Sequence, residues 1–560
     1  MTSSPSAHAS WQNIGQAKRD AIQSHLPDEW KITPVPPPAA VRDAGIYARQ
    51  FLSPEEIEIT EALSARVLLS RLARGELSAV QVTKAFCHRA TIAHQLTNCL
   101  SEVIFTQALA DAKALDVAFQ RNGRRTVGPL HGLPISLKDQ YRVRDTETSL
   151  GYVGWLGRKE TPETESWIVQ ELRRQGAVVF AKTNVPTSLM AIETNNNLIG
   201  YTLNAANRLL SSGGSSGGEA ALIASGGSLL GLGSDVGASI RLPSGYNGIV
   251  GLRPSHGRLP YLGVANSMVG HNTLESVVGP LGRSIEDLRL LVKTVLAAEP
   301  WKADPKVLKL PWRDDEELDA LRKIVARKLT FGVLRDDGVV SPQPPVQRVL
   351  QDAVTKLKTR GYEEVIEWDP PAHSEAFDIA FKAFTADAGH DIHTQLALSG
   401  EPPVPEIAAV YGATAPPPDG RPSVNDLWTL QRRRDAFQEL YVQYWETTPV
   451  DALLVPVAPA VGYERGKGLY PGYTAAFSVL DYSVVTVRAG KAEKTRDKVR
   501  ERFGPRGEFD REIQAQYDPE LFDGSPVGLQ VVCRRLEEEK VLAIAEEVEK
   551  IIYNAENKSF

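Results

Sequence analysis

The sequence predicts an α/β protein in which a single large domain forms an α/β/α sandwich around a mixed, mostly parallel sheet. Short apolar segments typical of buried strands alternate with helical patterns along most of the chain. The second half has no motif of its own, so its strands most economically extend the sheet of the first half. The segments predicted as strands are residues 133–137, 177–181, 329–334, 452–457 and 529–532.

Bulk composition narrows the class of protein. The 560 residues carry 63 basic and 69 acidic side chains, and this net charge of −6 provides no basic field for nucleic acid or an anionic membrane. An odd count of three cysteines argues against a disulfide framework and favours a reducing compartment. The first residues lack a signal-peptide pattern, and no apolar run is long enough to span a bilayer. We therefore expect a cytoplasmic protein with no nucleic-acid partner and no stable membrane association.

The chain is predicted to begin with an arm. Residues 1–50 combine a short helical patch near residues 20–25 with a proline cluster at residues 34–38, and such a cluster favours an extended connector. Residues 51–560 form the main domain.

Helices are predicted where a capping signal opens an amphipathic stretch. Ser53 is followed by Pro54 and two acids, the preferred residues for a helix start. Ser78 opens a second helix in the same way. The other predicted helices cover residues 105–120, 165–175 and 217–224.

A lysine ends the first predicted strand. Alternation along residues 133–137 places Ser136 and Lys138 on the same face. If loops cover this strand end, desolvation lowers the pKa of Lys138, and a neutral lysine can act as a base near pH 7. A simple ion pair with Asp139 is the alternative interpretation.

The glycine-rich stretch of residues 213–218 contains Ser215 and Ser216 just before the predicted helix of residues 217–224. Such a position favours polar side chains and anions. A capped turn would explain it equally well. The stretch also satisfies the G-x-S-x-G pattern of the α/β-hydrolase nucleophile elbow, but no histidine has a distinguishing local context.

A second loop of small residues follows at residues 235–239. Several backbone N–H groups can converge there, which is how enzymes stabilise the oxyanion of a tetrahedral intermediate. Ser239 lies within this donor cluster, where an attacking oxygen is needed. Asp235 and Arg241 flank the loop, and a salt bridge between them would brace it.

Taken in order, residues 132–139, 213–218 and 235–241 resemble the amidase signature family. The match continues into residues 248–254 and is densest between about residues 125 and 290. Among the members, the chain is most similar to the fungal acetamidase type, on the basis of residues 26–31, 251–260 and 299–302.

The resemblance implies the amidase signature fold and an amidase that hydrolyses carboxamides to the acid and ammonia, without metal or cofactor. It implies a Ser–Ser–Lys triad in which Ser239 is the nucleophile, Ser215 the bridging serine after a cis peptide bond, and Lys138 the base. The implied oxyanion donors are the N–H groups of Val236, Gly237, Ala238 and Ser239. The implied supporting residues are Ser216, Asp235 and Arg241.

The sequence departs from the family at one position of the second loop, where Ala238 replaces the usual glycine. If that position requires a positive φ, alanine costs about 1 kcal/mol. Similar enzymes line the substrate channel in the region of Leu189, Met190 and Ala191, whose apolar character suits an alkyl or aryl acyl group.

Two other functions stay open at this point: an esterase of the α/β-hydrolase type centred on Ser215, and an amidotransferase subunit that passes ammonia to a partner. Homodimers are common among similar proteins, so the resemblance favours a homodimer.

Overall fold

The computed structural model describes residues 10–417, 421–500 and 503–553. Over these residues the structure has one sheet of eleven strands in the order β1-β3-β2-β4-β6-β5-β10-β11-β9-β7-β8. The strands are β1 (Leu100–Val103), β2 (Pro134–Lys138), β3 (Val178–Thr183), β4 (Leu230–Asp235), β5 (Val250–Arg253), β6 (Val277–Gly282), β7 (Phe331–Val333), β8 (Val365–Glu367), β9 (Ala452–Pro456), β10 (Ser483–Lys491) and β11 (Pro526–Cys533).

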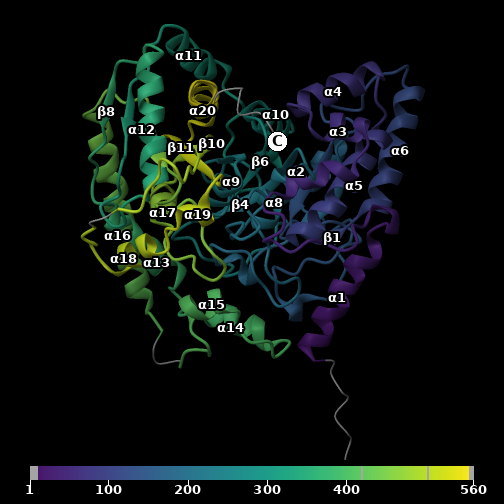
Figure 1. Cartoon of the computed structure of the whole chain (residues 1–560), viewed down its shortest axis with the longest axis horizontal. Coiled ribbons are helices and arrows are strands. Elements are labelled where there is room, and N and C mark those ends of the chain that lie inside the picture. Colours follow the sequence, from purple (N-terminus) through teal and green to yellow (C-terminus); the bar gives the residue numbers. More distant parts are fainter. Residues whose placement is uncertain (1–9, 418–420, 501–502, 554–560) are drawn as a thin grey trace, which may run out of the picture.

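Helices surround this sheet. Most helices of the N-terminal half lie at one side of the molecule and most of those of the C-terminal half at the other (Figure 1). The first half contains α1 (Trp11–His25), α2 (Ala44–Ala48), α3 (Pro54–Thr60), α4 (Ala65–Arg74), α5 (Ala79–Thr97), α6 (Phe105–Arg121), α7 (Trp167–Arg174), α8 (Gly217–Ala224) and α9 (Arg241–Asn247). The second half contains α10 (Ile285–Ala297), α11 (Asp314–Val325), α12 (Pro344–Thr359), α13 (His373–Phe384), α14 (His390–Ala397), α15 (Pro405–Tyr411), α16 (Val424–Glu446), α17 (Gly472–Val479), α18 (Glu508–Ala515), α19 (Pro519–Phe522) and α20 (Glu538–Ile552). Of these helices, α9 and α10 lie near the middle (Figure 1). Short 3₁₀ turns are η1 (Asp28–Trp30), η2 (Arg49–Phe51), η3 (Val153–Trp155), η4 (Thr187–Leu189) and η5 (Pro300–Lys302).

The α/β class and the single mixed sheet are confirmed, and the second half completes the sheet by pairing β10 with β5. The expectation that the sheet is mostly parallel was wrong. Only β2 with β3, β2 with β4, β7 with β8 and β7 with β9 are parallel, whereas the other six neighbouring pairs in the described sheet are antiparallel. An apolar run reveals that a strand is buried, but it carries no information about the direction of the neighbouring strand.

The N-terminal residues pack onto the main core. The helix predicted near residues 20–25 extends over the whole of α1, which Ser10 caps by accepting the N–H of Asn13. Ile22, Leu26 and Trp30 are buried in the same apolar cluster as β2 and β3. The helix is therefore longer than its local pattern indicates, because packing against the domain stabilises it.

The sheet topology brings the two motif segments together. β2 and β4 are parallel neighbours, with Ser136 opposite Gly231 and Leu137 opposite Leu232. Parallel strands end at the same edge of a sheet, and ligands commonly bind at such an edge. Lys138 at the end of β2 therefore lies beside the loop that follows β4. Among the described helices, none combines the length and the apolar character needed to cross a membrane.

Candidate active site

Lys138 is fully buried at the end of β2. Its Nζ atom lies 2.7 Å from Ser215 Oγ and 2.9 Å from Ser234 Oγ. Burial lowers the pKa of Lys138 to about 7, although the negative charges of Asp235 and Glu219 act in the opposite direction. A substantial fraction of this amine is therefore neutral at neutral pH, as the sequence predicts for a covered strand end.

The loop that carries Ser215 depends on glycine. The Gly214–Ser215 peptide bond is cis. A Cβ atom on Gly214 would lie 2.7 Å from the carbonyl oxygen of Ala191, so the loop backbone packs directly against the neighbouring chain. α8 begins immediately afterwards, and the Ser216 N–H donates to the carbonyl of Ser239 at 3.1 Å. This last bond joins the two serine loops.

Ser239 lies in the loop between β4 and α9. Within the described residues, no protein acceptor takes the backbone N–H of any of the four residues predicted as oxyanion donors, Val236, Gly237, Ala238 and Ser239. Ser239 keeps 7% of its surface exposed, against 1% for Ser215. The more accessible serine is therefore the one that lies among the unpaired N–H donors.

The Asp235–Arg241 salt bridge predicted from the sequence is present and completely buried. Arg241 Nη2 lies 2.8 Å from Asp235 Oδ1, and Nε lies 3.0 Å from Oδ2. The guanidinium also donates to the carbonyls of Gly237 and Thr474, which ties the Ser239 loop to α17. Burial raises the pKa of Asp235, but the charge and hydrogen bonds of Arg241, the charge of Arg253 and the Ile240 N–H together outweigh it and keep this pKa below its usual value.

Ala238 fits without backbone strain, because its φ does not lie in the left-handed region. Its side chain is buried in the apolar cluster formed by the C-terminal half. The penalty considered for alanine at this position therefore does not arise. Gly237 is the tighter position, since a Cβ there would lie 2.9 Å from Cζ of Phe384 at the end of α13.

The three predicted pocket residues lie in and just after η4. Leu189 is buried, whereas Met190 and Ala191 are partly buried, and all three belong to a cluster with residues of α14 and α15. The Ala191 carbonyl lies against Gly214, beside Ser215. The structure thus places the end of this segment next to the serine–lysine cluster.

Several polar neighbours of Lys138 were missed by the sequence analysis. Glu219 is fully buried, and its carboxylate accepts from the hydroxyl groups of Ser136 and Thr183. Burial raises the pKa of Glu219 to about 7. In the sequence, Glu219 is indistinguishable from an exposed acid in the first turn of a helix. Ser234 and Gln140 gave no local signal either.

The nucleophile-elbow alternative does not match the observed geometry. That motif needs a strand leading directly into the serine turn, whereas residues 210 and 211 before this loop form only isolated bridges. Ser215 Oγ contacts Lys138.

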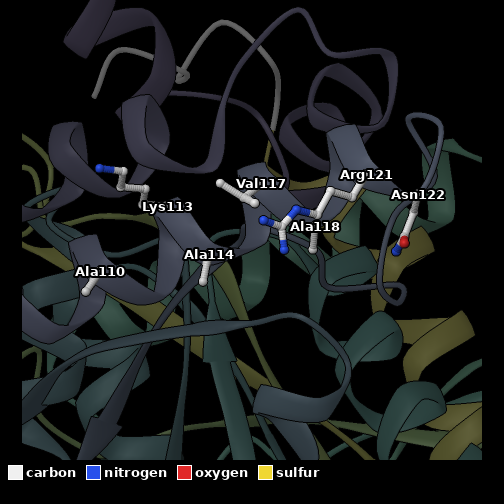
Figure 2. A pocket seen from close by; sticks show the side chains of 7 residues that line it. All are labelled: Ala110, Lys113, Ala114, Val117, Ala118, Arg121 and Asn122. Carbon is white, nitrogen blue, oxygen red and sulfur yellow. The ribbon is translucent and has the colours of Figure 1, made fainter.

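A separate recess lies on the outer side of α6, lined by residues that include Lys113, Val117 and Arg121 (Figure 2). It shares no residue with the serine–lysine cluster.

Comparison with known proteins agrees with this geometry. The Amidase family model matches residues 81–542. An acetamidase of Aspergillus oryzae is 44% identical, covering 97% of this chain and 99% of its own length. An acetamidase of Emericella nidulans is 43% identical with the same coverage. A solved fatty acid amide hydrolase superposes with a TM-score of 0.90 at 34% identity, covering 97% of this chain and 95% of that one. The chain therefore belongs to the Amidase family of amide-hydrolysing enzymes.

Proposed function

We propose that this enzyme hydrolyses carboxamides through a triad of Ser239, Ser215 and Lys138. One observation carries the proposal: the buried amine of Lys138 lies 2.7 Å from the hydroxyl of Ser215. The loop of Ser215 is in turn hydrogen-bonded to the backbone carbonyl of Ser239. A neutral amine, a bridging hydroxyl and a second hydroxyl among free N–H donors are the groups that acyl transfer requires.

In the proposed reaction, neutral Lys138 accepts the proton of Ser215, and Ser215 accepts the proton of Ser239 as its oxygen attacks the amide carbonyl. The C–O bond forms while the carbonyl electrons move to oxygen, and the N–H groups of residues 236–239 stabilise the resulting oxyanion. Ser215 then gives its proton to the leaving nitrogen and takes back the proton held by Lys138. The oxyanion re-forms the carbonyl, ammonia departs as the C–N bond breaks, and Lys138 is neutral again. Water attacks the acyl-enzyme by the same proton route and releases the carboxylic acid and free Ser239.

The substrates are proposed to be small carboxamides, because the two fungal relatives reported above are named acetamidases. Phe384 lies directly against Gly237. Ala191, the residue after Met190, borders the Ser215 loop on another side. These apolar groups are placed to limit the size of the acyl group.

Replacing Phe384 by alanine should shift preference toward bulkier amides. Removal of the ring opens space beside Gly237. A hydrophobic pocket discriminates between acyl groups that differ by one methylene by at least about tenfold in kcat/KM. The ratio of kcat/KM for a branched or aryl amide to that for acetamide should rise by about tenfold or more. Ammonia release across a panel from acetamide to aryl amides measures this ratio.

Phe381→Ala is the matched control, because Phe381 lies on the same helix but is 44% exposed. It should leave the ratio unchanged. An unchanged ratio in Phe384→Ala would contradict the pocket assignment. The same assay tests the amidotransferase alternative, because ammonia release only in the presence of a second protein would contradict hydrolysis by this chain alone.

The remaining expectations are part of the same proposal. They are a cytoplasmic location, assembly as a homodimer, and division of the chain into an arm of residues 1–50 and a main domain of residues 51–560.

A further inference from the structure

A second serine contacts the amine of Lys138. Ser234 precedes Asp235 at the end of β4, and its Oγ lies 2.9 Å from Lys138 Nζ. Its hydroxyl donates to Oε1 of Gln140 at 2.5 Å. Gln140 is fully buried, and Ser234 is only 3% exposed. Lys138 therefore has two hydroxyl neighbours, of which the proposed reaction uses only Ser215.

The direction of the Ser234 hydrogen bond is set by the other end of the Gln140 side chain. Gln140 Nε2 donates to the hydroxyl oxygen of Tyr261 at 2.8 Å and to the carbonyl of Ala265 at 3.3 Å. Both partners suit an NH₂ group, so the amide oxygen must face Ser234. The Tyr261 hydroxyl in turn donates to Ser276 Oγ at 3.2 Å, which leaves its oxygen free to accept from Gln140.

A hydroxyl has one hydrogen to donate. Since Ser234 directs this hydrogen to Gln140, it presents only lone pairs to Lys138 and can act there only as an acceptor. A neutral amine has two hydrogens and one lone pair. Ser234 Oγ accepts one N–H of the Lys138 amine. The second N–H faces the Ser234 carbonyl oxygen, which lies 3.5 Å from Nζ. The lone pair is left for Ser215.

We propose that Ser234 and Gln140 are positioning residues that occupy the N–H donors of Lys138 and so direct its lone pair to the Ser215 hydroxyl. This inference rests on the proposed function. Neither residue touches the substrate, and both act through the orientation of the base.

Charged groups near Lys138 have a different effect. Asp235 at the end of β4 and Glu219 in α8 are the charges that raise the pKa of Lys138 against its burial. They influence how much of the amine is neutral. They do not select which of two hydroxyl groups meets the lone pair, and this selection needs the directed hydrogen bonds of Ser234 and Gln140.

A double-mutant cycle tests this role. In Gln140→Met, the freed Ser234 hydroxyl can donate to the lone pair of Lys138 in competition with Ser215. We expect kcat to fall by about 10-fold to 100-fold, the cost of turning a catalytic group away from its reactive geometry, while KM for acetamide stays the same. The acid limb of the pH profile should move to lower pH, because a donor to the neutral amine stabilises its neutral form.

Ser234→Ala removes the competing hydroxyl and an acceptor of the protonated amine, so kcat should fall and the acid limb should again move to lower pH. In this background Gln140→Met should cost nothing further, because no hydroxyl remains for it to release. Ser234→Thr keeps the hydroxyl and should recover most of the loss. Tyr141→Phe is the control, since it removes a buried hydrogen bond to the Gly233 carbonyl without touching Lys138, and it should keep the wild-type pH profile.

The inference would be overturned if the decreases in kcat caused by Gln140→Met and Ser234→Ala simply add in the double variant. It would also be overturned if neither single variant moves the acid limb of the pH profile. If Ser234→Ala does not fold, Gln140→Met and Ser234→Thr decide the question through the same pH profiles. Failure of the proposed function looks different, because Lys138→Met or Ser239→Ala would then retain wild-type turnover.

Discussion

Ser239→Ala is expected to lower the rate of amide hydrolysis by about six orders of magnitude, as removal of a serine nucleophile does in enzymes whose catalytic groups act as a unit. The oxygen that attacks the carbonyl is lost, while the N–H donors of residues 236–239 and the apolar pocket remain. Acetamide binding should therefore persist while turnover stops. Ammonia release measures turnover, and mass mapping of a serine-directed phosphonate should find the adduct on Ser239 in the wild type and on no serine in the variant.

Ser244→Ala is a matched control for this prediction. Ser244 is buried in α9, and its hydroxyl has no hydrogen-bond partner among the described residues. Its loss should leave both turnover and labelling intact. An adduct on Ser215 in the wild type, or retained turnover in Ser239→Ala, would show that Ser239 is not the nucleophile.

Arg241→Met is expected to produce the largest loss of stability, about 3–5 kcal/mol in the free energy of unfolding. Both side chains of this pair are completely inaccessible to solvent. The substitution therefore leaves the Asp235 carboxylate buried without the charge of Arg241 and without water to replace it. It also removes the donors that hold the carbonyls of Gly237 and Thr474. The Ser239 loop should therefore lose its geometry, and activity should fall with stability. Urea denaturation measures the change in the free energy of unfolding.

An exposed ion pair gives the comparison for this variant. Arg335 donates from Nε to both carboxylate oxygens of Glu367, but these side chains are 39% and 67% exposed. Arg335→Met should cost at most about 1 kcal/mol. Replacing both partners, Asp235→Leu with Arg241→Met, should restore part of the stability that Arg241→Met loses. If Arg241→Met costs no more than Arg335→Met, the buried pair does not brace the loop.

Local sequence signals predicted some elements well. The helix predicted at residues 217–224 is α8 with the same bounds, because a glycine loop followed by strong helix formers is a local signal. The strand predicted at residues 529–532 is longer, because β11 begins at Pro526 and pairs with β10 along its whole length. Strand direction could not be predicted, since it depends on partners distant in the sequence.

The same distinction holds for the site. Spacing and family resemblance predicted Lys138, Ser215, Ser239 and the Asp235–Arg241 pair as site residues. In the structure, Lys138 contacts Ser215, the two serine loops are hydrogen-bonded, and the ion pair is present. Gln140 meets Ser234, 94 positions away, and Phe384 reaches Gly237 from the second half of the chain. Such contacts are produced by the fold alone, and glutamine, serine and phenylalanine carry no pattern that would reveal them.

Neutral Lys138 acting through Ser215 is the central claim, and the pH dependence of kcat/KM for acetamide tests it most directly, because this substrate does not titrate. With the pKa of Lys138 at about 7, kcat/KM should be level above this pH and fall about tenfold per unit below it, as the amine becomes protonated. Glu219→Gln should retain the acid limb and displace it only slightly to lower pH, since the pKa of Glu219 is also about 7 and its carboxylate is only partly charged where Lys138 titrates. Lys138→Arg should be inactive at every pH, because a guanidinium stays protonated. The account would be contradicted if wild-type kcat/KM stayed level down to about pH 5, roughly two units below this pKa. An active Lys138→Arg variant would also contradict it.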